Sequence, residues 1–171
     1  MKRVFFPLLF LFIIDGVIPQ TQVNELLTEN LTLPIGLDVS IPRFTWLLDN
    51  NTRNIIQTAY EIEVKSDNLF VWRSGKVISD SSVLVAYKGV PLESNTLYTW
   101  RVRVWDNTGQ MSDWSSYTRF RTGFLHSSDW KAQWITPGFE EDTINRPSPY
   151  LRKTFQTKKE IRHAILYVTS H

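Results

Sequence analysis

The sequence predicts an all-β chain built around an antiparallel β-sandwich. Residues 97–115 read L-Y-T-W-R-V-R-V-W-D-N-T-G-Q-M-S-D-W-S, a two-residue alternation before a turn. Its inward face should hold Tyr98, Trp100, Val102 and Val104, and its outward face Thr99, Arg101, Arg103 and Trp105. Short strands bounded by Gly, Pro, Asn and Asp recur along the chain without a helical period. The 171 residues are 42% hydrophobic and 13% aromatic, which is enough for a packed core.

The first half of the chain supplies four expected strands. Alternating apolar residues over 23–33 indicate an edge strand, and a second strand is expected over 37–41; a proline ends each of them. In P-R-F-T-W-L-L, the aromatic residues Phe44 and Trp46 take alternate positions, so a third strand should turn both toward the core. The fourth, residues 59–65, alternates between an inward face (Tyr60, Ile62, Val64) and an outward face (Glu61, Glu63, Lys65).

The second half supplies the remaining strands, over 69–73, 82–87, 98–106 and 117–122. Seven or eight short strands within about a hundred residues are typical of an immunoglobulin or fibronectin type III-like sandwich. The spacing of Leu92, Thr96 and Tyr98 predicts a tyrosine corner, in which the ring hydroxyl ties down the loop that enters the strand. We expect this sandwich to cover residues 23–124.

The N-terminus resembles a secretory leader. Lys2 and Arg3 precede an apolar run over 4–14, which is too short to span a bilayer but suits the apolar region of a signal peptide. We therefore expect a signal peptide over 1–22 and an exported protein, periplasmic or extracellular in a bacterium. After cleavage, no membrane association is expected.

Composition narrows the functional classes. The chain has no cysteine, which excludes disulfides and thiolate chemistry, and its three histidines lack metal-ligand spacing. A net charge of +2 gives no reason to expect a nucleic-acid partner. The contiguous acids Glu140, Glu141 and Asp142 lie in an expected loop and form an acidic linker better than a catalytic pair. We expect no catalytic residue, no metal and no cofactor.

The outward face of the later sheet combines aromatic and cationic side chains. Glu61 and Glu63 should lie across neighbouring strands from arginines, which favours a cross-strand charge ladder with tryptophans among the guanidinium groups. The same side chains could instead form a face that contacts a ligand or another domain. The candidate residues for that face are Arg101, Arg103, Trp105, Trp114, Arg119 and Arg121.

An ordered series of motifs resembles a known family. The series comprises P-I-G-L-D, P-R-F-T-W-L-L, R-N-I-I-Q-T-A-Y-E-I-E-V, V-W-R-S-G-K-V, the 97–115 segment and D-W-K-A-Q-W-I. Over residues 36–152 it is similar to the N-terminal region of bacterial α-L-rhamnosidases of glycoside hydrolase family 78. The resemblance implies an immunoglobulin or fibronectin-like module ahead of a β-sandwich, a catalytic (α/α)₆ barrel and a C-terminal β-domain. Such enzymes hydrolyse terminal α-L-rhamnose with inversion, using two carboxylates of the barrel.

Residues 125–171 resemble the start of the second sandwich, with strand composition over 164–168. Because so few strands cannot enclose a hydrophobic core, we expect this segment to be poorly packed or to lie against the first domain. Because the chain ends before the barrel, we expect a fragment that acts as the non-catalytic accessory part of an exported α-L-rhamnosidase. Its expected partners are a rhamnose-containing glycan, reached through the full-length enzyme, and the enzyme's other domains. The alternatives are a freestanding carbohydrate-binding or adhesion module and a structural spacer.

Overall fold

The computed structural model describes residues 20–140, 142, 144–145, 148–161 and 164–169. The chain divides into two compact units, Met1–Lys131 and Ala132–His171. Most of the expected signal peptide, residues 1–19, lies outside the described residues, so the leader stays a prediction.

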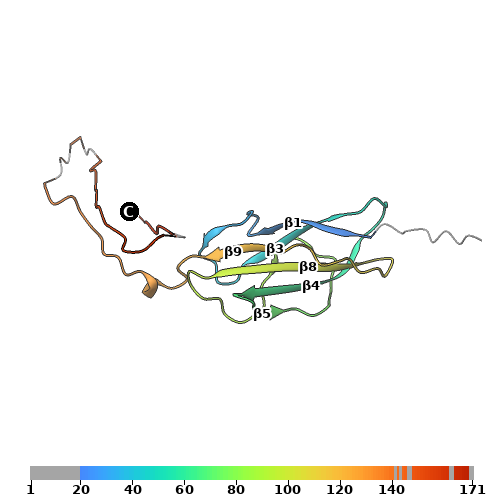
Figure 1. Cartoon of the computed structure of the whole chain (residues 1–171). Coiled ribbons are helices and arrows are strands. Elements are labelled where there is room, and N and C mark those ends of the chain that lie inside the picture. The colour runs from blue at the N-terminus through green and yellow to red at the C-terminus, as the bar shows by residue number, and fades with distance from the viewer. Residues whose placement is uncertain (1–19, 141, 143, 146–147, 162–163, 170–171) are drawn as a thin grey trace, which may run out of the picture. The chain divides into compact units, whose positions relative to one another are not determined.

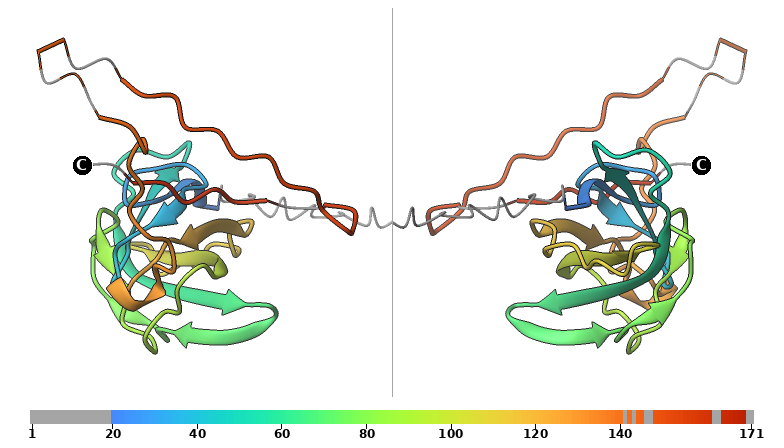
Figure 2. Two further views of the ribbon diagram at one scale, coloured as in Figure 1. Left: turned by 90° about the vertical axis from the view of Figure 1, so that its left-hand side faces the viewer. Right: turned by 90° about the vertical axis from the view of Figure 1, so that its right-hand side faces the viewer.

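The first unit is a β-sandwich, and the all-β immunoglobulin-like prediction is confirmed. The two sheets appear as separate layers in Figures 1 and 2. One sheet has the order β1-β3-β7, with strands Gln22–Thr28, Arg43–Asp49 and Val85–Ala86. The other has the order β2-β9-β8-β4-β5, with strands Ile35–Leu37, Thr118–Thr122, Leu97–Asp106, Gln57–Ser66 and Leu69–Arg73. A short strand β6, Val77–Ile78, also pairs with β4.

The core lies between the sheets and follows the two-residue period of the sequence. In β8 every second residue from Tyr98 to Asp106 is buried, while the residues between them are half-buried. The inward side chains expected on β4 and β8, together with Phe44, Trp46 and Phe120, form the buried cluster. The indole N–H of Trp46 donates to Gln57 Oε1 at 2.9 Å, and that of Trp100 donates to Thr28 Oγ1 at 3.0 Å. Both buried donors are therefore satisfied, as a dry core requires.

The tyrosine corner is confirmed. The hydroxyl oxygen of Tyr98 accepts a hydrogen bond from the Glu93 backbone N–H at 2.8 Å. Thr122 Oγ1 accepts from the Thr96 N–H at 2.9 Å and donates to the Glu93 carbonyl at 2.6 Å. Burial raises the pKa of the Tyr98 hydroxyl, so the group stays neutral and holds the loop in place.

Several expected strand boundaries are wrong. β1 ends at Thr28 rather than at residue 33, because the chain turns at Glu29 and Asn30, whose φ are 52° and 60°, and Thr28 and Leu31 then bond to each other through their backbone N–H and carbonyl groups. β2 covers Ile35–Leu37 rather than 37–41, and it pairs in parallel with β9. The strand expected over 82–87 is reduced to Val85–Ala86.

The second unit is described by itself. Its described residues form no strand, so the strand expected over 164–168 is wrong. Large apolar side chains are exposed there, including Trp134 at 66% and Phe139 at 68%. Strand composition is not sufficient where no neighbouring strand supplies hydrogen bonds and a buried face. Within the described residues, no helix has the length and apolarity needed to cross a bilayer.

Candidate functional site

The outer face of the β4–β8 pair brings acids and arginines into register. Glu61 lies opposite Arg103, and Glu63 lies opposite Arg101. Arg103 binds Glu61 Oε2 through Nε at 2.8 Å and Nη2 at 2.6 Å. Arg101 binds Glu63 Oε2 in the same way, at 2.8 and 2.7 Å, and Arg73 approaches the other oxygen of Glu63 at 3.7 Å. The expected cross-strand charge ladder is confirmed for these residues.

Aromatic rings alternate with cations along the same face. From one end to the other the row runs Lys76, Trp105, Arg103, Trp114, Arg101, Tyr117, Lys65, Phe70 and Arg73. We call these nine residues the cation-π ladder. The distances from cationic groups to ring centroids range from 3.5 Å, for Arg73 and Phe70, to 5.3 Å, for Arg103 and Trp105. Each ring is approached by two cations, which is favourable by about 0.5–1 kcal/mol per exposed contact.

Two serines position Trp114 in the ladder. The hydroxyl oxygens of Ser112 and Ser115 accept the backbone N–H groups of Val104 and Val102, each at 3.0 Å. The N–H groups of the same serines donate to the carbonyls of Val104 and Val102, each at 2.9 Å. Ser112 and Ser115 therefore each form two hydrogen bonds with the backbone of β8. Trp114, which lies between the two serines, packs against Arg101 and Arg103. The sequence signal was the pair of serines flanking Trp114 in S-D-W-S.

Arg119 and Arg121 are not part of the ladder. Both are on β9, which pairs with β8 only along residues 97–100, whereas Glu61 and Glu63 lie across from residues 103 and 101. Arg121 instead donates to the Asn95 carbonyl at 2.8 Å. The four arginines that the sequence grouped on one face are thus divided between two places on the same sheet.

The ladder uses its own polar groups. Both glutamates accept paired hydrogen bonds from guanidinium groups, and their side chains are only 18% and 11% exposed. An inverting glycosidase needs an acid and a base about 6.5–9.5 Å apart with room for a water between them. These carboxylates are instead occupied by arginines. These ion pairs stabilise the pairing of β4 with β8 and leave the carboxylates in no arrangement suited to glycoside hydrolysis.

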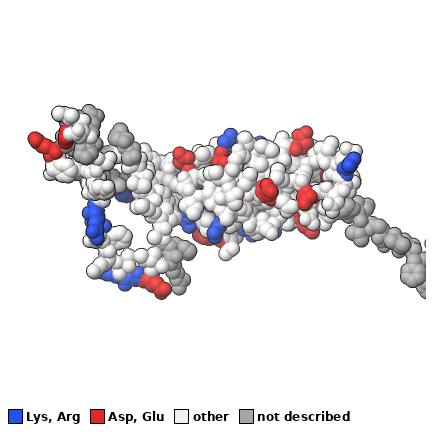
Figure 3. Space-filling view, turned by 90° about the horizontal axis from the view of Figure 1, so that it is seen from above, with Lys and Arg blue, Asp and Glu red and all other residues white. Residues whose placement is uncertain are grey.

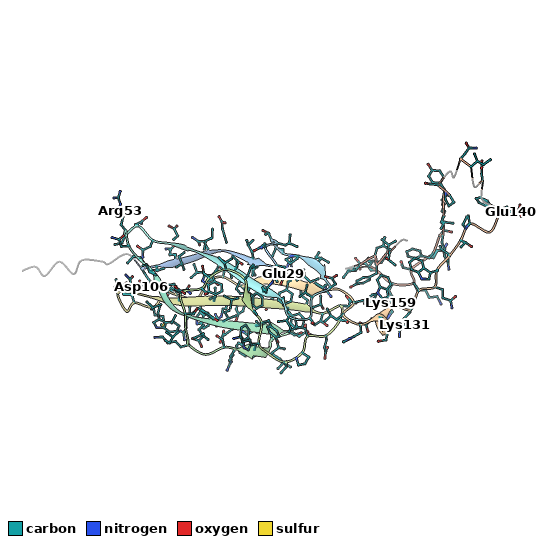
Figure 4. All side chains as sticks on the ribbon, turned by 180° about the vertical axis from the view of Figure 1, so that it is seen from behind. Glu29, Arg53, Asp106, Lys131, Glu140 and Lys159 are labelled. Carbon is teal, nitrogen blue, oxygen red and sulfur yellow. The ribbon has the colours of Figure 1, made fainter. Side chains whose placement is uncertain are left out.

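Asp106 forms a second polar centre, at the end of the sandwich where Figure 4 also labels Arg53. Its Oδ1 accepts from the Thr108 N–H, the Thr108 hydroxyl and the Gln110 N–H, and its Oδ2 accepts from the Thr21 hydroxyl at 3.0 Å. Burial opposes ionisation, but these hydrogen bonds outweigh it and hold the pKa of Asp106 below its usual value. The carboxylate closes the turn after β8. Sequence reasoning assigned it no role, although D-N-T-G is a turn signal.

The acidic cluster of the second unit is a turn. Asp142 accepts from the side chain of Asn145 at 2.7 Å and from the backbone N–H groups of Ile144 and Asn145. The Asn145 side chain is the largest cause of the lowered pKa of Asp142. Glu140 is exposed, and Glu141 lies outside the described residues. Asp142 therefore caps a turn of this loop.

Hollows in the described surface are shallow. One of about 510 Å³ lies beside β5 and is lined by Phe70, Val71, Trp72, Arg73, Lys88, Gly89 and Val90. A smaller one of about 200 Å³ is lined by Gln20, Gln22, Asp49, Asn50 and Asn51. On the face in Figure 3, charged side chains of the sandwich are scattered among uncharged ones. Among the residues that the structure describes, no group of three or more His, Cys, Asp or Glu side chains is placed to hold a metal ion.

A family model and several curated proteins are similar to this chain, and all of them concern α-L-rhamnosidases. The family model "Rha78A-like, N-terminal immunoglobulin domain" matches residues 23–126. An α-L-rhamnosidase of Streptomyces avermitilis is 42% identical over 120 residues, covering 67% of this chain and 12% of that protein. One from Formosa agariphila is 35% identical over 158 residues, covering 84% of this chain and 17% of that protein.

Solved structures agree with these relatives. The Streptomyces avermitilis α-L-rhamnosidase complexed with L-rhamnose matches with a TM-score of 0.65 and 40% identity, over 68% of this chain and 12% of that chain. The α-L-rhamnosidase from Dictyoglumus thermophilum matches with a TM-score of 0.66 and 38% identity, over 70% of this chain and 14% of that chain. The chain spans 12–17% of the length of the curated relatives it matches.

Proposed function

Because the chain belongs to the Rha78A-like N-terminal immunoglobulin domain family, we propose that it serves as the non-catalytic N-terminal portion of an exported α-L-rhamnosidase. The observation that carries this proposal is the pattern of coverage. Relatives named α-L-rhamnosidases match most of this chain over only 12–17% of their own length. The remaining length of such an enzyme would carry the hydrolysis of terminal α-L-rhamnose from glycans.

The contacts of three acidic side chains in the sandwich support a non-catalytic role. Glu61 and Glu63, the half-buried and buried acids of the ladder, are each held by an arginine fork. Asp106, at the end of the sandwich, is held by hydroxyl and backbone donors that keep it ionised. A glycosidase acid needs an environment that raises its pKa until it can donate a proton, whereas the hydrogen bonds to Asp106 lower the pKa of that carboxyl. These acids are therefore suited to stability and not to proton transfer.

Export is part of the same proposal. Lys2 and Arg3 followed by the apolar run over 4–14 support a signal peptide, and the lack of cysteine is compatible with an oxidising compartment. A rhamnose-containing glycan would then meet the enzyme outside the cytoplasm. N-terminal sequencing of the secreted protein tests this, because a start between residues 17 and 23 is expected. Retention of Met1 in the mature protein would contradict export by this route.

The non-catalytic role is tested with an aryl α-L-rhamnoside. We expect the purified chain to release no more aryl alcohol than buffer alone, while the longer polypeptide read on from the same gene cleaves the substrate. Turnover by the chain itself, abolished by Glu61→Gln or Glu63→Gln, would overturn the non-catalytic assignment. A longer polypeptide without rhamnosidase activity would overturn the enzyme assignment.

A freestanding carbohydrate-binding module has less support. Binding by stacking needs a ring face that is free to meet a sugar, whereas each ring of the cation-π ladder is already approached by two cations. The ladder therefore favours a role in holding the sheet together.

A further inference from the structure

The larger sheet ends at β5, which is an apolar edge strand. In the described part of the chain only β4 pairs with it, so the outer edge of β5 lies at the side of the sandwich, as Figure 1 shows. Its sequence, L-F-V-W-R, has four apolar residues in a row, of which Leu69 is 76% exposed and Phe70 is 38% exposed. The edge strands β2 and β7 have only three and two residues. An uncharged apolar strand with a free edge is a template for pairing with another chain.

A short segment lies against this edge. Residues 87–90, Y-K-G-V, follow β7 of the smaller sheet and cross to β5 of the larger one, and we call them the strap. The Val90 N–H donates to the Val71 carbonyl at 3.4 Å. Val71 is the extra residue of a bulge and has no residue opposite it on β4. The strap therefore occupies the free edge of β5 at the point where the pairing of β5 with β4 is itself interrupted.

Tyr87 anchors the strap. Its backbone N–H donates to the Pro42 carbonyl at 2.9 Å, and its hydroxyl donates to the Val90 carbonyl at 2.8 Å and lies 3.4 Å from the Val71 carbonyl. Its ring packs edge to face on Trp72, with the ring centroids 5.2 Å apart. Burial raises the pKa of the Tyr87 hydroxyl to about 12, so the hydroxyl stays a neutral donor. One side chain thus joins both ends of the strap to the core and to β5.

Only glycine fits in the middle of the strap. A Cβ on Gly89 would lie 2.6 Å from the Cβ of Trp72 and closer still to the Tyr87 hydroxyl oxygen. Gly89 is not among the residues with positive φ, so glycine is required here by space and not by backbone conformation. The strap therefore lies directly on the two side chains that hold it, and a side chain at position 89 has to displace either Tyr87 or the strap.

We propose that the strap guards β5 against edge-to-edge pairing with β5 of a second copy of this chain. A second copy presents the same apolar strand, and two antiparallel copies of one strand can pair about a two-fold axis. Lys88 of the strap and Arg73 at the end of β5 add exposed cations, which also oppose pairing at a sheet edge. β1, the other long edge strand, has an irregular register between Asn24 and Leu27 that serves the same purpose. When the strap is displaced, two copies should associate through β5.

Gly89→Val tests the guard on the purified chain. The added side chain displaces the strap, so light scattering should give a larger mass for the variant than for the wild-type chain under the same conditions. Amides of residues 69–73 should exchange about tenfold more slowly in a concentrated than in a dilute sample of the variant, because a partner strand then covers them. The wild-type chain should show no such dependence on concentration. Tyr87→Phe removes the hydroxyl but keeps the ring, and it should associate in the same way at higher concentration.

Two controls separate release of the strap from a general loss of stability. Val102→Ala removes buried volume from β8 and leaves the contacts of the strap in place, so it should not associate. Leu69→Lys, added to Gly89→Val, places a charge on β5 itself and should return the variant to a monomer. Association of Val102→Ala to the same extent as Gly89→Val would overturn the proposal, as would a wild-type chain that already pairs through residues 69–73. If Gly89→Val does not fold, Tyr87→Phe decides, and a folded Tyr87→Phe chain that stays monomeric at every concentration overturns the proposal.

Discussion

The two faces of the β4–β8 pair are held by different forces. On the inner face, Trp100, Val102 and Val104 are fully buried against the opposite sheet. On the outer face, Arg101, Arg103 and Trp105 keep part of their surface in water and are held by ion pairs and cation-π contacts. Burial is worth several kcal/mol for a large side chain, whereas an exposed ion pair contributes about 0.2–1 kcal/mol. The inner face of this pair of strands therefore provides most of its stability, and the outer face adds a smaller contribution.

Substitution of the inner tryptophan should have the largest effect. Trp100→Ala leaves a cavity and removes the donor to Thr28, so the free energy of unfolding should fall by about 3–5 kcal/mol. Trp105→Ala, on the outer face of the same strand, is the matched control and should cost about 1 kcal/mol. Urea denaturation of both variants measures the difference. Equal losses would remove the distinction between the faces.

The tyrosine corner at the start of the same strand should come next. Tyr98→Phe deprives the Glu93 N–H of its acceptor and should lower the free energy of unfolding by about 1–2 kcal/mol. Tyr117→Phe, in the exposed ladder, should change it by less than about 0.5 kcal/mol. The same denaturation curves provide the measurement, and an equal response of the two tyrosines would contradict the role of the corner.

Asp106 is the last inward residue of β8 and carries a charge. Its contribution to the free energy of unfolding should therefore depend on pH. Its pKa is lowered in the folded state, so the stability it contributes is present above the unfolded-state pKa of about 3.9 and is lost as pH falls through the folded pKa. Asp106→Asn should cost about 1 kcal/mol at pH 7, where a charged hydrogen-bond acceptor is lost. The variant should lose less stability than the wild type between pH 5 and pH 2. Parallel acid curves for the two proteins would show that Asp106 is not a source of this pH dependence.

The outer ladder should give the smallest effect. A double-mutant cycle with Glu61→Gln and Arg103→Gln should yield a coupling energy of about 0.5 kcal/mol, reduced in 1 M NaCl because the pair is only partly buried. The loss from Trp100→Ala should not respond to salt in this way. A coupling energy above about 3 kcal/mol would place the outer pair in the class of buried ion pairs and reverse the comparison.

The sequence was sufficient for the parts of the fold that depend on periodicity. Two-residue alternation predicted the inward and outward faces of β4 and β8, because such a pattern has one arrangement in a half-buried strand. It did not predict the early end of β1, since positive φ at Glu29 and Asn30 is set by the turn they form and not by their own preference.

The candidate site was predicted in part for the same reason. The contacts of Arg101 and Arg103 follow from the register of β4 and β8, which alternation alone suggests. The extension of the ladder to Phe70 and Lys76 depends on how the chain after β4 folds back, and alternation contains no such information. The position of Arg121 was missed because β9 meets β8 along only part of its length.

The supporting role of the outer face is tested most directly by the indole N–H signals of Trp105 and Trp114 in the NMR spectrum of the chain. These signals would be followed during titration with rhamnose-containing oligosaccharides, with assignments from Trp105→Phe and Trp114→Phe. If the rings are already engaged by cations of the ladder, neither signal should shift in a saturable way. A saturable shift of either signal would contradict the supporting role and make this face a carbohydrate-binding surface.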